Sequence, residues 1–343
     1  MNYSNQKIIV TGGLGYIGSH TVIELCAKGF KVIIVDDLSN SSLKILNGIN
    51  DITNSKLVFE KIDLKNKRLV KNLFTKHKDV TGLIHFAASK YVGESIDNPI
   101  KYYENNLNSL INILDELKNL GTKINFIFSS SCTVYGEAKN FPITEQESVK
   151  KAESPYGNTK QICEEIIEDF IKSYGNIKAI SLRYFNPVGA HESGKIGELP
   201  SGKPQNLVPL ITQTAIGKFK ELIVHGNNYP TVDGTCIRDY IHVVDLSKSH
   251  LKSLTKLIDE KNNLHYDVFN VGTGKGSSVF EVISSFERIT KMKLNYRIGP
   301  KRNGDVIKAF ACTKKANEIL KWKAELSLDQ ALLSAWEWQK KNN

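Results

Sequence analysis

A glycine-rich turn near the start of the chain restricts the possible fold more than any other feature. The residues Thr11-Gly12-Gly13-Leu14-Gly15-Tyr16-Ile17-Gly18 follow an apolar run at 7–11 and space three glycines as Gly-x-x-Gly-x-x-Gly. Such a turn needs positive φ, a backbone that a pyrophosphate can approach without a Cβ in the way, and a helix packed close to its strand. The helix N-terminus then offers free amides to the phosphates. The turn predicts a dinucleotide site, with a turn that serves packing alone as the alternative.

Short β-branched runs alternate with amphipathic stretches through the first half of the chain. The runs lie at 7–11, 31–36, 56–63, 82–88, 125–131 and 178–184. Strands that alternate with helices form a parallel sheet with helices on both faces. We therefore expect an α/β fold with a Rossmann-type doubly wound parallel sheet.

The pattern changes at Asn186, where a stretch rich in glycine and proline runs to about Gln205. A loop of this length is usually functional or disordered. Beyond it, helix-like segments mix with short strand-like ones, at 207–218, 279–292 and 328–341 and at 221–225, 268–271 and 294–298. We expect a first domain at 1–185, to which about 235–275 returns, and a smaller α/β domain over most of 186–343.

Two carboxylates end the second strand-like run. Asp36-Asp37 follows the glycine turn by about 20 residues, the spacing at which an acidic residue accepts hydrogen bonds from the adenosine ribose. A carboxylate there repels a 2′-phosphate. The pair therefore favours NAD over NADP as the cofactor.

A tyrosine and a lysine open the predicted helix after residue 154. Ser154 is suited to cap this helix, and Tyr156 and Lys160 are four residues apart, so their side chains share one face. A tyrosine base near neutrality needs its pKa lowered by about three units, which a nearby ammonium, a cationic nicotinamide ring and a hydrogen-bond donor can supply. Ser131, at the end of the fifth run, is the candidate donor. We expect Tyr156 as acid/base, Lys160 as its modulator and Ser131 as the group that orders a substrate hydroxyl; an amphipathic helix with a surface lysine is the alternative.

Composition excludes several other classes of protein. The five cysteines are scattered and odd in number, which argues against a disulfide framework or a zinc site, so no metal is expected. The charge of +10 comes from basic residues spread along the chain, which indicates a solvated surface rather than nucleic-acid binding. No apolar run approaches the roughly 18 residues that cross a bilayer, so no membrane contact is expected. The polar N-terminus leads straight into the first strand-like run, and we expect a cytoplasmic protein.

The glycine spacing, Tyr-x-x-x-Lys and the serine-rich strand end resemble the extended short-chain dehydrogenase/reductase superfamily. Within it, the chain is similar to the UDP-glucose 4-epimerase family from about Lys7 to Trp338. The similar stretches lie at 85–95, 182–191, 206–209, 233–243 and 302–305.

The resemblance implies a set of binding residues for NAD and for a UDP-sugar. Besides Tyr156 and Lys160, the residues it assigns to the cofactor are Gly12, Gly15, Tyr16, Ile17, Gly18, Asp36, Asp37, Asn40, Ser41, Asp63, Leu64, Phe86, Ala87, Lys90, Asn105, Tyr184 and Phe185. Those it assigns to the substrate are Ser131, Tyr156, Asn186, Asn206, Arg238, Arg302, Asp305 and Ala309. As the alternative to substrate binding, Arg238 could form a local salt bridge with Asp239, and Arg302 one with Asp305. The first domain would then hold NAD and the second mainly the UDP-sugar.

The implied reaction is reversible 4-epimerisation of UDP-glucose and UDP-galactose through a transient 4-ketosugar, in a homodimer. Another nucleotide-sugar epimerase or dehydratase and a catalytically silent NAD-binding regulator are the alternatives. A dehydratase carries an acidic pair after the Thr of its strand-end motif, and 131–136 has no carboxylate. Ser89, Tyr91 and Cys132 depart from the commonest pattern of the family near the nicotinamide.

Ala309 stands where the family has a gatekeeper residue for the sugar pocket. A bulky tyrosine there restricts the pocket to glucose and galactose, and a smaller residue leaves room for a 2-acetamido group. Ala309 therefore predicts that UDP-GlcNAc and UDP-GalNAc are also substrates, with an alanine of no functional effect as the alternative.

Overall fold

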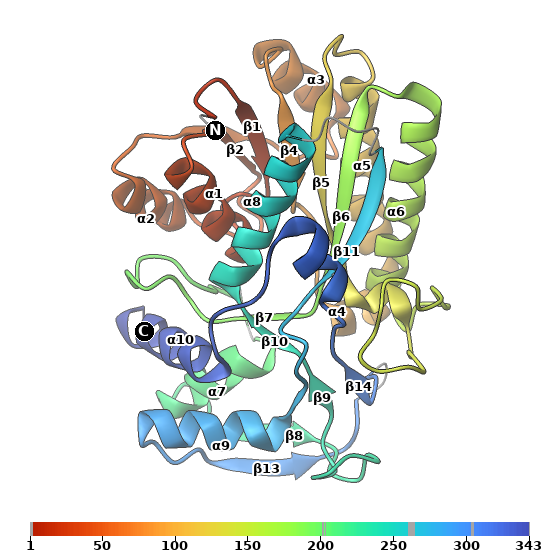
Figure 1. The fold of residues 1–343 in the computed structure, drawn as a ribbon. Helices are drawn as coiled ribbons and strands as arrows, with labels where there is room; N and C mark the ends of the chain where they lie inside the picture. Colours follow the sequence, from red (N-terminus) through yellow and green to blue (C-terminus); the bar gives the residue numbers. More distant parts are fainter. Residues whose placement is uncertain (1–2, 201, 203, 260–264, 303–304, 343) are drawn as a thin grey trace.

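A parallel sheet forms the upper half of the computed structural model, which describes residues 3–200, 202, 204–259, 265–302 and 305–342 (Figure 1). Its strands are β1 (Lys7–Thr11), β2 (Lys31–Asp36), β3 (Val58–Lys61), β4 (Gly82–His85), β5 (Ile124–Ser131), β6 (Ile177–Tyr184) and β11 (Tyr266–Val271). All of them pair in parallel, in the order β11-β6-β5-β4-β1-β2-β3. The order reverses between β1 and β4, which is where sheets of this type bind ligands.

Helices cover both faces of this sheet, because its strands are apolar on both sides. Ile8 and Val10 of β1 face one core together with helices α1 (Tyr16–Ala27), α2 (Leu43–Thr53) and α8 (Val243–Asp259). Ile9 faces a second core together with helices α3 (Lys67–Lys76), α5 (Pro99–Leu117) and α6 (Pro155–Tyr174). Successive residues of a strand point to opposite faces, so one apolar run serves both cores. The predicted doubly wound α/β fold is confirmed.

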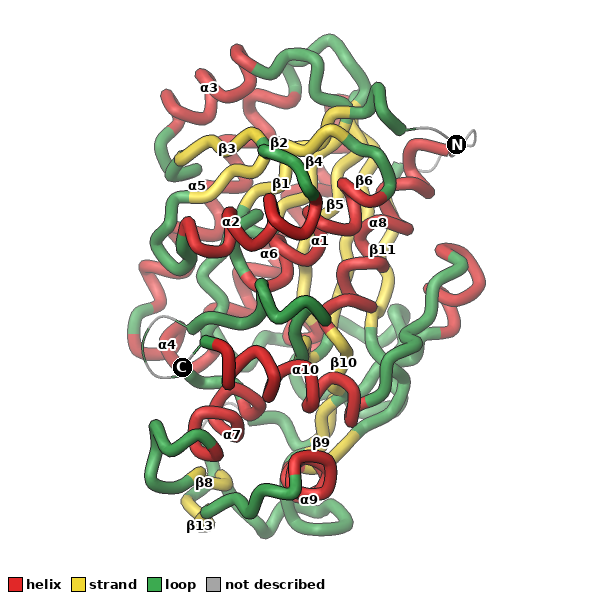
Figure 2. The backbone as a smooth tube through the Cα atoms, turned by 90° about the vertical axis from the view of Figure 1, so that its left-hand side faces the viewer, coloured by secondary structure: helices red, strands yellow, loops and turns green. Residues whose placement is uncertain are grey.

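A small α/β unit lies below the sheet, as Figure 2 shows from the side. It comprises α7 (Leu207–Ala215), α9 (Val279–Thr290), α10 (Leu328–Lys341) and β8 (Leu222–His225), which share a third core, and β13 (Tyr296–Gly299), which pairs with β8. Short paired segments join the two parts: β7 (Asn186–Val188), β9 (Ile237–Arg238), β10 (Tyr240–His242), β12 (Ser277–Ser278) and β14 (Lys308–Ala309). The remaining elements are α4 (Val92–Asp97), a 3₁₀ turn at Cys132–Tyr135 and a π-helical turn at Ala316–Leu320.

Several segment ends differ from the prediction for local reasons. The helix expected at 207–218 ends at Ala215, and Gly217 follows with φ +85. The helix expected at 279–292 ends at Thr290, because Lys291 adopts the left-handed conformation as its C-cap. The stretch expected as a loop after Asn186 begins with β7, which pairs with β10. Asn303 and Gly304, which belong to one of the quoted family motifs, lie outside the described residues.

Ser278 anchors α9 to the rest of the small α/β unit. Its hydroxyl accepts from the Glu281 amide at 3.1 Å, and the Glu281 carboxylate accepts from the Ser278 amide at 2.7 Å. The same hydroxyl donates to Asp233, which also holds the turn at Thr235. The capping box therefore fixes both the helix start and the chain that leads to β9.

Replacing Ser278 with alanine is expected to destabilise the protein by about 1–2 kcal/mol, because the helix loses its cap. Urea unfolding followed by circular dichroism would measure the shift in midpoint. Ser173→Ala, at an exposed position in α6, is the matched control and should leave the midpoint unchanged. An equal midpoint for Ser278→Ala and the control would contradict the role given to this cap.

Candidate active site

One cavity of about 1340 Å³ runs from the carboxyl ends of the parallel strands to the small α/β unit. Every residue predicted above for the cofactor, the catalytic group or the substrate lines it. Those residues come from segments as far apart as the glycine turn and β14. The fold thus brings together groups that local sequence patterns could only propose one at a time.

The glycine turn lies at one end of the cavity and packs directly against the end of β4. Gly12 has φ +65, and a Cβ there would lie 2.8 Å from the Ala87 amide nitrogen. A Cβ at Gly18 would collide with the Gly12 carbonyl oxygen. Helix α1 starts at Tyr16 with no side-chain cap and no acidic residue in its first turn. Its amides and dipole suit a diphosphate, so this end of the cavity fits a dinucleotide.

Asp36 organises the loops around this turn. Its carboxylate accepts from the amides of Leu14 and Leu38, each at 3.0 Å, and from the Ser41 hydroxyl at 2.7 Å. Burial raises the pKa of Asp36, and these hydrogen bonds oppose that change. Asp37 holds Ser39 in the same loop. Asp36 therefore shapes the adenosine end of the cavity as well as offering an acceptor to it.

Tyr156 and Lys160 line the cavity from the first turns of α6. Ser154 caps this helix by accepting from the Gly157 amide at 3.2 Å, as the sequence predicted. The Lys160 side chain is almost completely buried; its Nζ donates to the Ser129 carbonyl oxygen at 2.7 Å and lies 5.9 Å from the centre of the Tyr156 ring. The ammonium therefore faces the tyrosine while a backbone carbonyl anchors it.

The pKa of the tyrosine moves in the opposite direction from the one a base requires. Burial raises the pKa of Tyr156 to about 12, and its hydrogen bond with Ser131 only partly opposes this. Burial also lowers the pKa of Lys160 to about 8. Ser131 lowers the tyrosine pKa, but burial outweighs it, because removal from water disfavours the charged form. The cationic nicotinamide ring, the third contribution expected from the sequence, is supplied by the cofactor and not by the protein.

Two arginines converge on one carboxylate at the sugar end of the cavity. Arg302 makes a two-pronged contact with Asp305, with Nε–Oδ2 at 2.9 Å and Nη2–Oδ1 at 3.1 Å. Arg238 Nη2 lies 3.7 Å from the same Asp305. Asp239 instead accepts from the amides of Thr273, Gly274 and Ala311. The alternative pair Arg238–Asp239 is therefore wrong, whereas the pair Arg302–Asp305 forms.

Ala309 lies beside these arginines in the cavity wall. It pairs with Arg238 across β14 and β9 and packs in a cluster with Val134, Tyr135 and Phe185. Cys132 packs against the same cluster and also lines the cavity. Since Ala309 lines the cavity, a larger side chain at position 309 would narrow it.

Glu198 is a charged residue of the cavity that the sequence did not single out. Its carboxylate accepts from Lys90 Nζ at 3.3 Å and from Asn206 Nδ2 at 3.1 Å. Trp338 in α10 fixes its backbone oxygen at 2.9 Å. Burial opposes a charged Lys90, but Glu198 outweighs it and raises the pKa of Lys90. Glu198 is one of two acidic residues in a stretch rich in glycine and proline, and nothing in the sequence connects it to Lys90.

Asn106 was also missed, next to the predicted Asn105. It is buried, accepts from the Ser89 amide at 2.7 Å and donates to the Thr159 hydroxyl at 2.9 Å. Asn105 lies at the cavity and donates to the Ser89 hydroxyl at 3.3 Å. The pair fixes the loop that carries Lys90 against α6.

Across the described ranges, no group of three or more His, Cys, Asp or Glu side chains is arranged to hold a metal ion. Among the helices of those same ranges, none combines the length and the apolar character needed to cross a membrane.

Comparison with known proteins agrees with this geometry. The family model for GDP-mannose 4,6 dehydratase matches residues 9–334. The UDP-glucose 4-epimerase of Bacillus subtilis is 44% identical over 337 residues, with 98% of each chain covered. That of Drosophila melanogaster is 44% identical over 341 residues, with 98% of this chain and 97% of the relative covered.

Two solved structures share the fold over nearly the whole chain. The UDP-glucose 4-epimerase of Stenotrophomonas maltophila, with bound NAD and formylated UDP-arabinopyranose, is 40% identical, with a TM-score of 0.93 and 98% of each chain covered. That of Bifidobacterium longum, in complex with NAD⁺ and UDP, is 43% identical, with a TM-score of 0.93 and 98% and 99% covered. With this identity over nearly all of its length, and with the glycine turn, the tyrosine and lysine, and the paired arginines in one cavity, the chain belongs to the UDP-glucose 4-epimerase family.

Proposed function

We propose that this chain interconverts UDP-glucose and UDP-galactose with a tightly bound NAD. The observation that carries the proposal is that a single cavity is lined by the glycine turn, by Tyr156 and Lys160, and by Arg238 and Arg302. The solved relative from Bifidobacterium longum was crystallised in complex with NAD⁺ and UDP, which supports the same pair of ligands for this chain.

In the proposed reaction, the residues that line the cavity have separate roles. NAD, when bound, accepts a hydride from sugar C4 and returns it. Tyr156 takes the proton of the 4-hydroxyl, and Ser131 orders that hydroxyl. Arg238 and Arg302 bind the diphosphate, for which their planar forks are suited, so that the sugar turns while its UDP stays anchored. Lys160 carries a positive charge beside the tyrosine and the nicotinamide ribose.

Because Tyr156 is buried, the bound cofactor would also be needed to lower the pKa of this phenol. Since the protein alone holds the pKa of this phenol at about 12, a phenolate near neutrality needs an additional positive charge in the cavity. The ring of oxidised NAD carries one, and a nearby opposite charge favours the ionised form. The fold then gives an active tyrosine only when cofactor and protein are combined.

We assign the two ligands to different parts of the chain. Residues 1–185 and about 235–275 hold NAD, and 186–343 otherwise hold mainly the UDP-sugar. The pairing of β11 with β6 and the packing of α8 on the same core as α1 support the return of the later segment. A homodimer, implied by the family resemblance, and a cytoplasmic location, inferred from the N-terminal sequence, belong to the same proposal.

Two results would separate an epimerase from its alternatives. Purified protein given UDP-galactose without added NAD should form UDP-glucose, identified by chromatography against standards. A dehydratase would instead form a 4-keto-6-deoxy product, and a silent regulator would form none. The absence of a carboxylate at 131–136 and the named epimerases among its relatives favour the first outcome, although the matching family model is named after a dehydratase.

Tyr156→Phe removes the phenol and should lower kcat by about 10²–10⁴-fold, the range for a positioned acid/base. Steady-state turnover of UDP-galactose measures it. Tyr296→Phe removes the same hydroxyl from an exposed site on β13 and should keep full activity. Undiminished turnover in the Tyr156 variant would rule out the role proposed for it.

Gly18→Ala should abolish NAD retention, because the new Cβ would displace the Gly12 carbonyl and open the turn. The measurement is NAD released per chain on acid denaturation of the purified protein. Gly121→Ala adds the same methyl group to an exposed position with open space around it, and should retain NAD like the parent. Equal NAD content in both variants would contradict the assignment of the glycine turn.

We also propose that UDP-GlcNAc and UDP-GalNAc are substrates, because the small Ala309 leaves room in the cavity wall. Ala309→Tyr should lower kcat/KM for UDP-GalNAc at least about tenfold and leave UDP-galactose within a few-fold of the parent. Val232→Tyr adds the same side chain at a fully exposed position and should change neither. Negligible use of UDP-GalNAc by the parent would defeat this part of the proposal.

A further inference from the structure

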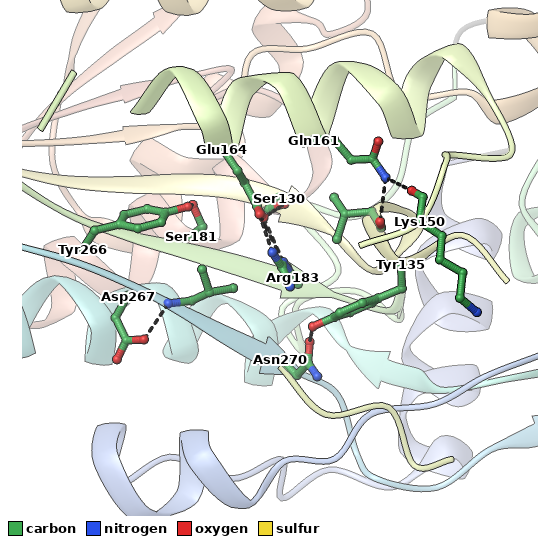
Figure 3. Close-up of polar contacts among 12 residues, drawn as sticks. Ser130, Tyr135, Lys150, Gln161, Glu164, Ser181, Arg183, Tyr266, Asp267 and Asn270 are labelled. Atoms are coloured by element: carbon green, nitrogen blue, oxygen red, sulfur yellow. Dashed lines mark hydrogen bonds and ion pairs between the residues drawn. The ribbon is translucent and has the colours of Figure 1, made fainter. Parts of the chain in front are cut away.

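A buried ion pair between Glu164 and Arg183 lies between α6 and the sheet (Figure 3). Arg183 of β6 donates from Nε to Glu164 Oε1 at 3.0 Å and from Nη2 to Oε2 at 2.5 Å. Ser130 of β5 donates its hydroxyl to the same Oε1 at 2.5 Å. Both charged side chains are less than a tenth exposed. The carboxylate is therefore held by three donors from two neighbouring strands.

The guanidinium is itself fixed in place by neutral groups. Arg183 Cζ lies 4.9 Å from the centre of the Tyr135 ring. The Tyr135 hydroxyl donates to Asn270 Oδ1 at 2.7 Å, and Asn270 Nδ2 donates to the Ile143 carbonyl at 2.8 Å. Figure 3 shows Tyr135 and Asn270 beside the ion pair, at the end of β11. Such support restricts the arginine to one orientation.

Glu164 has a second possible partner, because it lies one helical turn after Lys160. Opposite charges at this spacing on a helix attract, and attraction is strong where water is excluded. The electric field of Glu164 reaches Lys160 and favours its charged form. Yet Lys160 Nζ donates to the Ser129 carbonyl oxygen. The position of the ammonium therefore depends on which cation the carboxylate binds.

We propose that Arg183 is a positioning residue: by holding Glu164 in its fork, it prevents that carboxylate from capturing Lys160 and leaves the ammonium facing Tyr156. The inference rests on the proposed catalytic roles of Tyr156 and Lys160. Glu164 then supplies negative charge near the buried Lys160 ammonium without binding it. Ser130, which donates to Glu164, connects this ion pair to the end of β5, where Ser131 lies.

Arg183→Met removes the fork and should redirect Lys160 to Glu164. We expect kcat for UDP-galactose to fall at least about tenfold, with KM within a factor of about two, because an interaction that acts in the transition state is lost. The double variant Glu164→Gln/Arg183→Met removes both charges and should recover most of that kcat. Glu164→Gln alone leaves an unpaired arginine but frees no carboxylate that could capture Lys160, so its kcat should fall clearly less than that of Arg183→Met.

Thermal unfolding separates this role from a structural one. Both single variants break the same buried pair, so both should lower Tm to a similar extent. If kcat simply follows Tm, the two singles will lose activity alike and the proposal fails. A crystal structure of Arg183→Met gives a readout apart from activity: Lys160 Nζ should lie within hydrogen-bond distance of Glu164, and an unchanged bond to Ser129 would overturn the proposal.

If Arg183→Met does not fold, Arg183→Lys takes its place. A lysine keeps the charge but cannot reproduce the fork, so kcat should fall a few-fold, and adding Glu164→Gln should raise it again. No rise on adding Glu164→Gln would count against the proposal. If the parent protein were inactive, the proposed function would be wrong. If the parent were active, Tyr156→Phe inactive and Arg183→Met fully active, only the role proposed for Arg183 would be wrong.

Discussion

The buried ammonium of Lys160 is the interaction on which the rest of the site depends. Removing a charge from water is expensive unless hydrogen bonds and other charges replace the solvent. Here the Ser129 carbonyl accepts a hydrogen bond, the Phe128 ring lies 4.9 Å away, and Glu164 acts from the next helical turn. Each of these groups requires α6 to lie in one register against β5. The hydrogen bond from Ser130 of β5 to Glu164 of α6 fixes that register.

Compensation of buried charge also explains why the cavity is built from both the sheet and the small α/β unit. The glycine turn and the N-terminus of α1 can take a diphosphate at one end, while Arg238 and Arg302 can take another at the far end. Asp305 lies between the two arginines and limits their mutual repulsion. Glu198, fixed by Trp338 of α10, reaches Lys90 beside β4 and so links the small α/β unit to the sheet. Tyr156 and Lys160 thus share their cavity with two sets of paired charges, the arginines with Asp305 and Lys90 with Glu198.

Much of this could be predicted from sequence, because the decisive patterns are local. The spacing of Gly12, Gly15 and Gly18, the cap at Ser154 and the helical pairing of Tyr156 with Lys160 each depend on residues a few positions apart. The contacts of Glu198 with Lys90 and of Arg238 with Asp305 join distant segments, and short strands such as β9 and β14 exist only through such pairing. The burial that raises the pKa of Tyr156 could not be predicted for a related reason, since burial depends on the whole fold. One usable signal was overlooked: Glu164 shares a helix face with Tyr156 and Lys160, and a charge on a buried face implies a partner.

The central claim, that one bound NAD takes and returns the same hydride while Tyr156 moves only the hydroxyl proton, can be tested in deuterated water. UDP-galactose would be converted to equilibrium, and the product examined by NMR at sugar C4. The mechanism predicts no deuterium at C4, because the hydride never exchanges with solvent. Deuterium at C4 would contradict it and point to proton abstraction from carbon instead.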